Sequence, residues 1–123
     1  MNVLIPILSP HFPTDFLTQF NSKDFVILFL PIDKSSALRG FAFATQEAAE
    51  CQTKISELKK ILIERNIPCV DLVEWCIDPA RKIDALAQLK QCEKIILVNQ
   101  TTVYFQEIFE KLKESTAYSV EVV

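Results

Sequence analysis

The sequence predicts an α/β protein in which a parallel sheet lies between two layers of helices. Residues 25–32 (FVILFLPI) and 95–98 (IILV) are continuously apolar or nearly so, as expected of strands buried on both faces of a sheet. Segments with helical spacing of apolar residues separate these strands from their neighbours along the chain. Such alternation is typical of right-handed crossovers in a three-layer fold.

The first half of the chain supplies two strands and two helices. Residues 3–8 (VLIPIL) form the first expected strand, although Pro6 removes a hydrogen-bond donor from it. A brief helix capped by Thr14 and stopped by Asn21 leads to the second strand, at 25–32, which Asp33 closes. A long amphipathic helix is then expected over about residues 43–66, since its apolar residues share one face: Cys51, Ile55, Leu58 and Leu62.

The second half contributes three strands and two helices. Residues 69–77 are expected to form a strand near a sheet edge, where Asp71 and Glu74 can reach water. Asp78 at the N-cap with Pro79 at the first helical position is a strong helix start. The central strand at 95–98 leads into a last helix capped by a threonine, and residues 119–123 (SVEVV) form a terminal strand.

Composition narrows the class of protein. The 123 residues suit one domain, 1–123. The chain has thirteen basic and sixteen acidic residues and no block of basic ones, so we do not expect a nucleic-acid-binding protein. No run reaches the roughly 18 apolar residues of a membrane span, and the apolar start is expected to be a strand and not a signal peptide. We therefore expect a soluble, cytoplasmic protein with no membrane association.

The cysteines do not predict a metal or redox site. The spacing of the four, Cys51, Cys69, Cys76 and Cys92, matches neither a CxxC pair nor a zinc knuckle. We expect buried thiols, no metal and no cofactor. A single glycine, Gly40, also excludes the glycine-lined loop that lets a backbone approach a pyrophosphate.

Polar residues follow the first and central strands, where ligands bind in sheets of this kind. Five of them are candidate ligand-binding residues: Ser9, His11, Asn99, Thr101 and Thr102. A helix N-terminus with two hydroxyls could hold a phosphate weakly, yet any helix needs such a cap. His11 is expected across the crevice from Asn99, without an acid or nucleophile partner. No catalysis is expected, and an enzyme using His11 or Cys76 remains a rival hypothesis.

With these elements in order, the chain resembles the universal stress protein family. The resemblance rests on VLIPI at residues 3–7, on the long helix before the third strand, and on Asp78-Pro79-Ala80 leading to KIILVN at 94–99. It implies a three-layer α/β/α sandwich with a five-stranded parallel sheet of order 3-2-1-4-5. It also implies a homodimer that pairs the terminal strands antiparallel, here through Ser119, Val120, Glu121, Val122 and Val123.

The family's ATP-binding branch carries features that this sequence lacks. Its aspartate, two residues after the first-strand proline, corresponds to Leu8, and its loop G-x2-G-x9-G-[ST] is reduced to Asn99 followed shortly by Thr101-Thr102. The resemblance therefore implies a dimeric module that does not bind ATP in the usual way and acts in stress response or regulation through an unknown protein partner. The alternative is a binder of AMP, another small nucleotide or an anion in a remodelled crevice.

Overall fold

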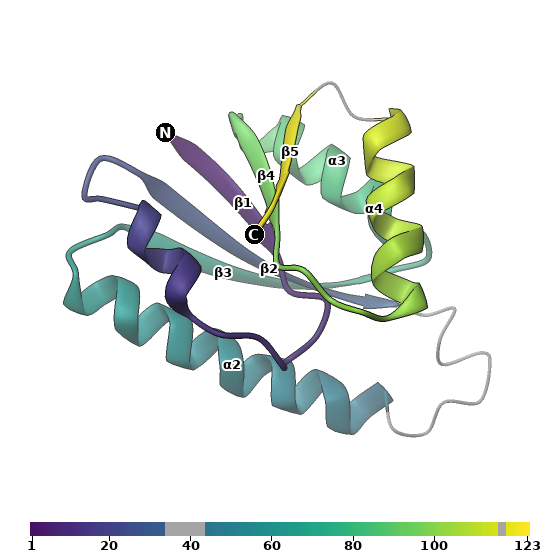
Figure 1. Cartoon of the computed structure of the whole chain (residues 1–123), viewed down its shortest axis with the longest axis horizontal. Helices are drawn as coiled ribbons and strands as arrows, with labels where there is room; N and C mark the ends of the chain where they lie inside the picture. Colours follow the sequence, from purple (N-terminus) through teal and green to yellow (C-terminus); the bar gives the residue numbers. More distant parts are fainter. Residues whose placement is uncertain (34–43, 116–117) are drawn as a thin grey trace.

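The computed structural model describes residues 1–33, 44–115 and 118–123 (Figure 1). In chain order its elements are β1 (Asn2–Pro6), the 3-10 helix η1 (Asp15–Gln19), β2 (Phe25–Asp33), α2 (Ala44–Glu64), β3 (Cys69–Cys76), α3 (Pro79–Leu89), β4 (Lys94–Leu97), α4 (Val103–Ser115) and β5 (Ser119–Val122). Gly40 and the expected helix start at residue 43 lie outside the described residues. Within the described ranges, no helix combines the length and hydropathy needed to cross a bilayer.

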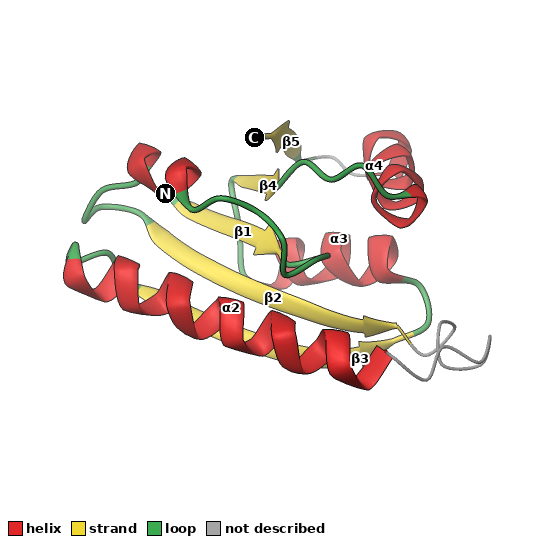
Figure 2. Ribbon diagram, turned by 60° about the horizontal axis from the view of Figure 1, so that its bottom comes forward, coloured by secondary structure: helices red, strands yellow, loops and turns green. Residues whose placement is uncertain are grey.

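The strands form one parallel sheet in the order β3-β2-β1-β4-β5. Helices η1 and α2 lie on one face of the sheet, and α3 and α4 lie on the other (Figures 1 and 2). This arrangement follows from the right-handed crossovers, because the chain winds outward to β3 and then returns to add β4 and β5 on the opposite side. The predicted three-layer fold and strand order are confirmed.

Alternate residues of the strands feed two hydrophobic cores. Val3 and Ile5 pack on the side of η1 and α2, whereas Leu4 packs on the side of α3 and α4. The expected apolar stripe of α2 is buried in the first core: Cys51, Ile55, Leu58 and Leu62. Full burial of each large apolar side chain contributes about 1.5–3 kcal/mol, so the two cores together fix the sheet between its helices.

Left-handed backbone conformations end two helices although the chain has almost no glycine. Asn66 follows α2 with φ of 60° and Gln91 follows α3 with φ of 54°. Beyond them the amide of Ile67 donates to Leu62 O and that of Cys92 donates to Ala87 O, both at 2.9 Å. These are the bonds that close a helix C-terminus around a left-handed residue. Asn66 thus ends α2 as the sequence predicts.

The first helix differs from expectation. It is a five-residue 3-10 helix, and Thr14 makes no side-chain cap. Instead the guanidinium of Arg65, just after α2, donates to Leu17 O and, at 2.9 Å, to Phe20 O. Carbonyls at the end of so short a helix lack full partners within it, and Arg65 supplies donors to two of them, whereas the predicted Thr14 cap, which would have accepted from an amide, is not formed.

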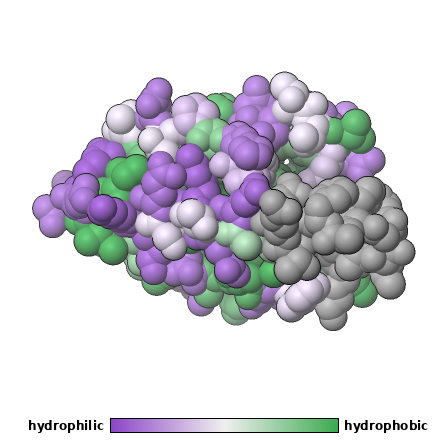
Figure 3. Space-filling view, turned by 90° about the horizontal axis from the view of Figure 1, so that it is seen from below, coloured by the Kyte–Doolittle hydropathy of each residue, from purple (hydrophilic) through white to green (hydrophobic). Residues whose placement is uncertain are grey.

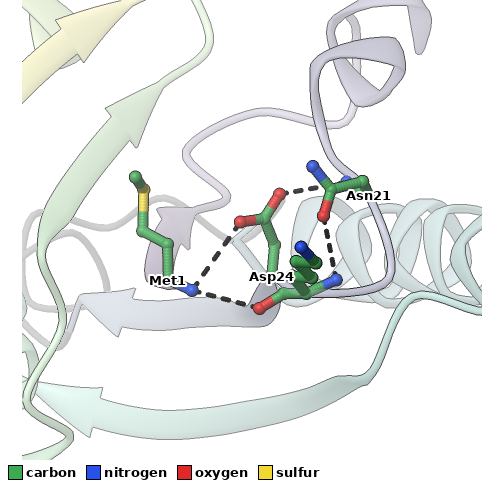
Figure 4. Close-up of polar contacts among 4 residues, drawn as sticks. Met1, Asn21 and Asp24 are labelled. Carbon is green, nitrogen blue, oxygen red and sulfur yellow. Dashed lines mark hydrogen bonds and ion pairs between the residues drawn. The ribbon is translucent and has the colours of Figure 1, made fainter.

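The N-terminus of β1 is held by the turn that precedes β2 (Figure 4). The α-amino group of Met1 donates to Lys23 O at 3.1 Å and lies 3.7 Å from an oxygen of Asp24. The other oxygen of Asp24 accepts from the amide of Asn21 at 3.0 Å. One carboxylate therefore organises the turn and neutralises the amine at the same time.

Candidate functional site

The candidate site lies where β1 and β4, adjacent in the sheet, send the chain to opposite faces. After β1 the chain passes over to η1, and after β4 it passes over to α4 (Figures 1 and 2). This switch point is where α/β sheets bind ligands. The five predicted residues all lie on the two loops that begin here, at 7–14 and 98–102.

On the first loop, Ser9 and His11 belong to a local turn. Ser9 is buried, and its Oγ accepts from the amide of His11 at 3.2 Å. The imidazole of His11 is 83% exposed, and its Nε2 lies 3.9 Å from a carboxylate oxygen of Glu50 on α2. The side chain of His11 therefore contacts α2, and its backbone is what faces the second loop.

The two loops are joined by a hydrogen bond from Gln100, which sequence reasoning did not single out. Its Nε2 donates to His11 O at 3.2 Å and so joins the two loops. The only signal in the sequence was that Gln100 is an amide side chain beside Asn99 in a polar turn. Its acceptor is a main-chain carbonyl of another loop, which a sequence pattern does not predict. The two loops are therefore bonded directly to each other through Gln100.

The second loop uses its polar groups in several ways. The amide of Asn99 donates to Val123 O at 3.0 Å, and Thr102 Oγ1 accepts from the amide of Phe105 at 3.2 Å as the cap of α4. The side chains of Asn99 and Thr101 are exposed. Thr102 is thus the threonine that caps the last helix, and Asn99 and Thr101 are the residues that could still meet a ligand.

Leu8 stands where the resemblance places an aspartate. Its half-buried side chain packs against the core formed with α3 and α4. An apolar group there cannot accept a hydrogen bond from an adenine amine. Among the described residues, no three acidic, histidine or cysteine side chains come close enough together to hold a metal ion.

The thiols fit the expectation of buried cysteines. Cys51, Cys76 and Cys92 are buried, Cys69 is half-buried, and none of the four forms a disulfide. Burial raises the pKa of the Cys69 and Cys92 thiols, and a thiol, unlike a thiolate, is a poor nucleophile.

A shallow polar groove lies between α3 and α4. It has a volume of about 420 Å³ and is lined by Asp78, Ala80, Arg81, Asp84, Lys111 and Glu114. Asp84 Oδ1 is buried, and within the described part of the chain it has no hydrogen-bond partner. Carboxylates and cations are mixed around the groove, so its charge does not select a ligand of one sign.

The two outer strands of the sheet differ in how their edges are covered. On β3, Asp71 pairs with Lys59 of α2 at 2.7 Å and Glu74 pairs with Lys82 of α3 at 2.6 Å, one ion pair on each face. On β5, Glu121 pairs with Lys94 of β4 at the longer distance of 3.5 Å.

Apolar side chains are exposed at both edges. Val122 and Val123 of the β5 edge are 42% and 39% exposed, and Val73 and Trp75 of β3 are 40% and 61% exposed. Seen from the side of α2, the surface that is not grey is largely hydrophilic, with hydrophobic groups scattered mainly near its borders (Figure 3).

Comparison with known proteins supports the fold alone. No protein-family model matches the sequence, and no curated protein matches it. Among solved structures, hypothetical protein MJ0577, whose biochemical function was assigned from its structure, has a TM-score of 0.76 at 20% identity, over 99% of this chain and 94% of that one.

Two universal stress proteins are also similar. UspA from Lactobacillus plantarum has a TM-score of 0.74 at 12% identity, over 100% of this chain and 97% of that one. The Archaeoglobus fulgidus protein in complex with dAMP has a TM-score of 0.65 at 12% identity, over 99% and 96%. The chain has the fold of the universal stress proteins.

Proposed function

We propose that this protein is a cytoplasmic homodimer that acts in stress response or regulation by associating with other proteins, and that it does not bind ATP in the usual way. The observation that carries the proposal is the outer edge of β5, where Val122 and Val123 are exposed beside a strand paired on one side only. A free edge presents unpaired N–H and C=O groups, and pairing with a second copy satisfies them.

The choice of β5 over β3 rests on charge. The ion pairs of Asp71 and Glu74 flank β3 on both faces, and charged side chains on an edge strand discourage pairing. Using both edges for identical pairing would also extend the sheet without limit, since two such interfaces on one chain produce an open filament. One homotypic edge is compatible with a closed dimer, and β5 is the less charged of the two.

Loss of the usual ATP site is supported by the crevice itself. Leu8 packs into the core where an adenine-binding carboxylate would stand. Gln100 bridges the two loops, and Thr102 is engaged in capping α4. The loop from Val98 to α4 is too short to hold the nine-residue spacer of a phosphate-binding glycine loop.

Mass measurement by light scattering tests the dimer. The wild-type protein is expected at twice its 14.1 kDa, and Val122→Lys is expected at the monomer mass because a lysine on the paired edge repels its copy. Val73→Lys places the same charge on β3 and should remain dimeric. A monomeric wild-type protein, or a dimer abolished by Val73→Lys and retained by Val122→Lys, would contradict the proposed interface.

The second candidate function is binding of AMP, another small nucleotide or an anion by Ser9, His11, Asn99, Thr101 and Thr102. It is favoured by the likeness to a protein that was solved with dAMP and by the exposed side chains of Asn99 and Thr101. Calorimetric titration with ATP and AMP, with and without magnesium, separates the two functions. Binding with a Kd near or below about 10 μM, roughly −7 kcal/mol, would support this second function. The binding should be lost in Thr101→Val and retained in Gln52→Ala, a variant at an exposed position of α2.

A further inference from the structure

The hydrogen-bond ladder between β4 and β5 continues past both strands into the candidate site. After the last registered pair, Leu97 with Val122, the amide of Val123 donates to Leu97 O at 3.0 Å. The amide of Asn99 then donates to Val123 O, also at 3.0 Å. Asn99, in the second loop of the candidate site, is therefore bonded directly to the end of the edge strand that we propose as the dimer interface.

From Asn99 the connection extends to the other wall of the crevice. The next residue, Gln100, donates to His11 O at 3.2 Å, and the amide of His11 donates to the buried Ser9 Oγ. Three hydrogen bonds and the peptide bond between Asn99 and Gln100 thus connect the sheet edge to the loop after β1. The second loop is held at one end by β5 and at the other by the first loop.

The bond between Asn99 and Val123 is the weak point of this connection. Val123 is half-exposed, and it lies at the end of a strand that has a neighbour on one side only. Terminal ladder bonds of this kind open locally at low free-energy cost. A second strand paired along the outer edge of β5 would add hydrogen bonds to the same strand and so reduce its opening.

We propose that Val123 couples the edge of β5 to the crevice loop at residues 99–102. Pairing of β5 with a second copy holds the loop in place, and a loop held in place strengthens the pairing by the same factor, because linkage is reciprocal. This inference rests on the proposed dimer and assigns a means of regulation to it: the conformation of the loop sets the strength of association.

Hydrogen exchange of single amides, followed by NMR during dilution, tests the first half of the coupling. Exchange of the Asn99 amide should quicken by about fivefold as the dimer dissociates, the scale of one backbone hydrogen bond. The control is the amide of Ile7, which donates to Phe29 O at 2.7 Å on the β2 side of β1. Its exchange should not follow the dimer.

Proline variants test the second half. Asn99→Pro removes the donor to Val123 and should weaken the dimer about fivefold, as measured by sedimentation equilibrium. Val103→Pro is the matched control, since it places the same ring in the same connection at the first position of α4, where proline is tolerated. Its dimer constant should equal that of the wild-type protein.

The outcomes separate this coupling from the dimer itself. If the protein is a dimer, if the exchange rate of the Asn99 amide does not change on dilution, and if Asn99→Pro does not weaken the dimer, the coupling is overturned. The proposed function is not affected by that result. A protein that stays monomeric overturns the proposed function. The connection between β5 and Asn99 is then tested in the monomer with Val120→Ala, which loosens the packing of β5 on the α4 side. Faster exchange of the Asn99 amide supports the connection, and unchanged exchange overturns it.

Discussion

Arg65 offers a quantitative test of how the loop after β1 is held. Its guanidinium donates to the carbonyls of Leu17 and Phe20 and so ties the end of α2 to η1. Leu17 and Phe20 are buried in the first core, while η1 has no side-chain cap of its own. Arg65→Ala removes both donors and leaves the two carbonyls to water or to weaker contacts within η1.

The size of the loss follows from the type of bond. A hydrogen bond to a charged group contributes about 1.5–3 kcal/mol, and two would give about 3–6 kcal/mol. Arg65 is exposed, so water replaces part of each interaction, and we expect a loss of about 1–2 kcal/mol in the free energy of unfolding. Arg65→Lys keeps the charge without the two-pronged donor and should lose about half as much.

Urea unfolding of the three proteins measures these differences, provided that the slope against denaturant is unchanged. Glu64→Ala is the matched control, because its exposed side chain at the end of α2 should change stability by less than about 0.5 kcal/mol. If Arg65→Ala is no less stable than Glu64→Ala, the contacts of Arg65 do not hold η1, and the reasoning is refuted.

Three further predictions concern ionisable groups. The hydrogen bond to Asp71 raises the pKa of Lys59 above 10.5, so the ion pair stabilises the folded protein below that pH. The difference in free energy of unfolding between the wild-type protein and Lys59→Met should therefore shrink as the pH rises beyond 10.5. Because burial raises the pKa of the Cys69 and Cys92 thiols, a disulfide reagent should react slowly at neutral pH and fully in urea; a thiol that reacts on mixing would favour the enzyme hypothesis. Extending the chain before Met1 removes the amine that Asp24 neutralises and should cost no more than about 1 kcal/mol in urea unfolding, with no further loss from Asp24→Asn.

The elements that the sequence predicted well are those whose signals are local. Apolar runs located the inner strands, and Asp78 with Pro79 marked the start of α3, where Asp78 Oδ1 accepts from the amide of Arg81 at 3.3 Å. Capping and periodicity depend on neighbours within one turn. The strand order came from the family resemblance, because pairing between distant segments is not written in any single window.

Contacts between distant segments escaped prediction for the same reason. Thr14 was predicted to cap the first helix and does not, and the donor to carbonyls at the other end of that helix is Arg65, which lies far along the chain. Asn66 and Gln91 adopt left-handed conformations at helix ends, yet only the asparagine is a residue type that signals such a conformation. A long side chain can reach any carbonyl that the fold brings near it, and the fold must be known first.

The candidate site shows the limit most clearly. Sequence position placed Ser9, Asn99 and Thr102 at the switch point, but polar side chains there serve either a ligand or the backbone, and the two uses require the same residue types. Ser9 and Thr102 bond to main-chain amides, whereas the link from Asn99 to Val123 uses no side chain at all. Backbone groups are identical in every residue, so a coupling built from them is invisible in sequence. Its consequences must be sought in amide exchange and in proline variants.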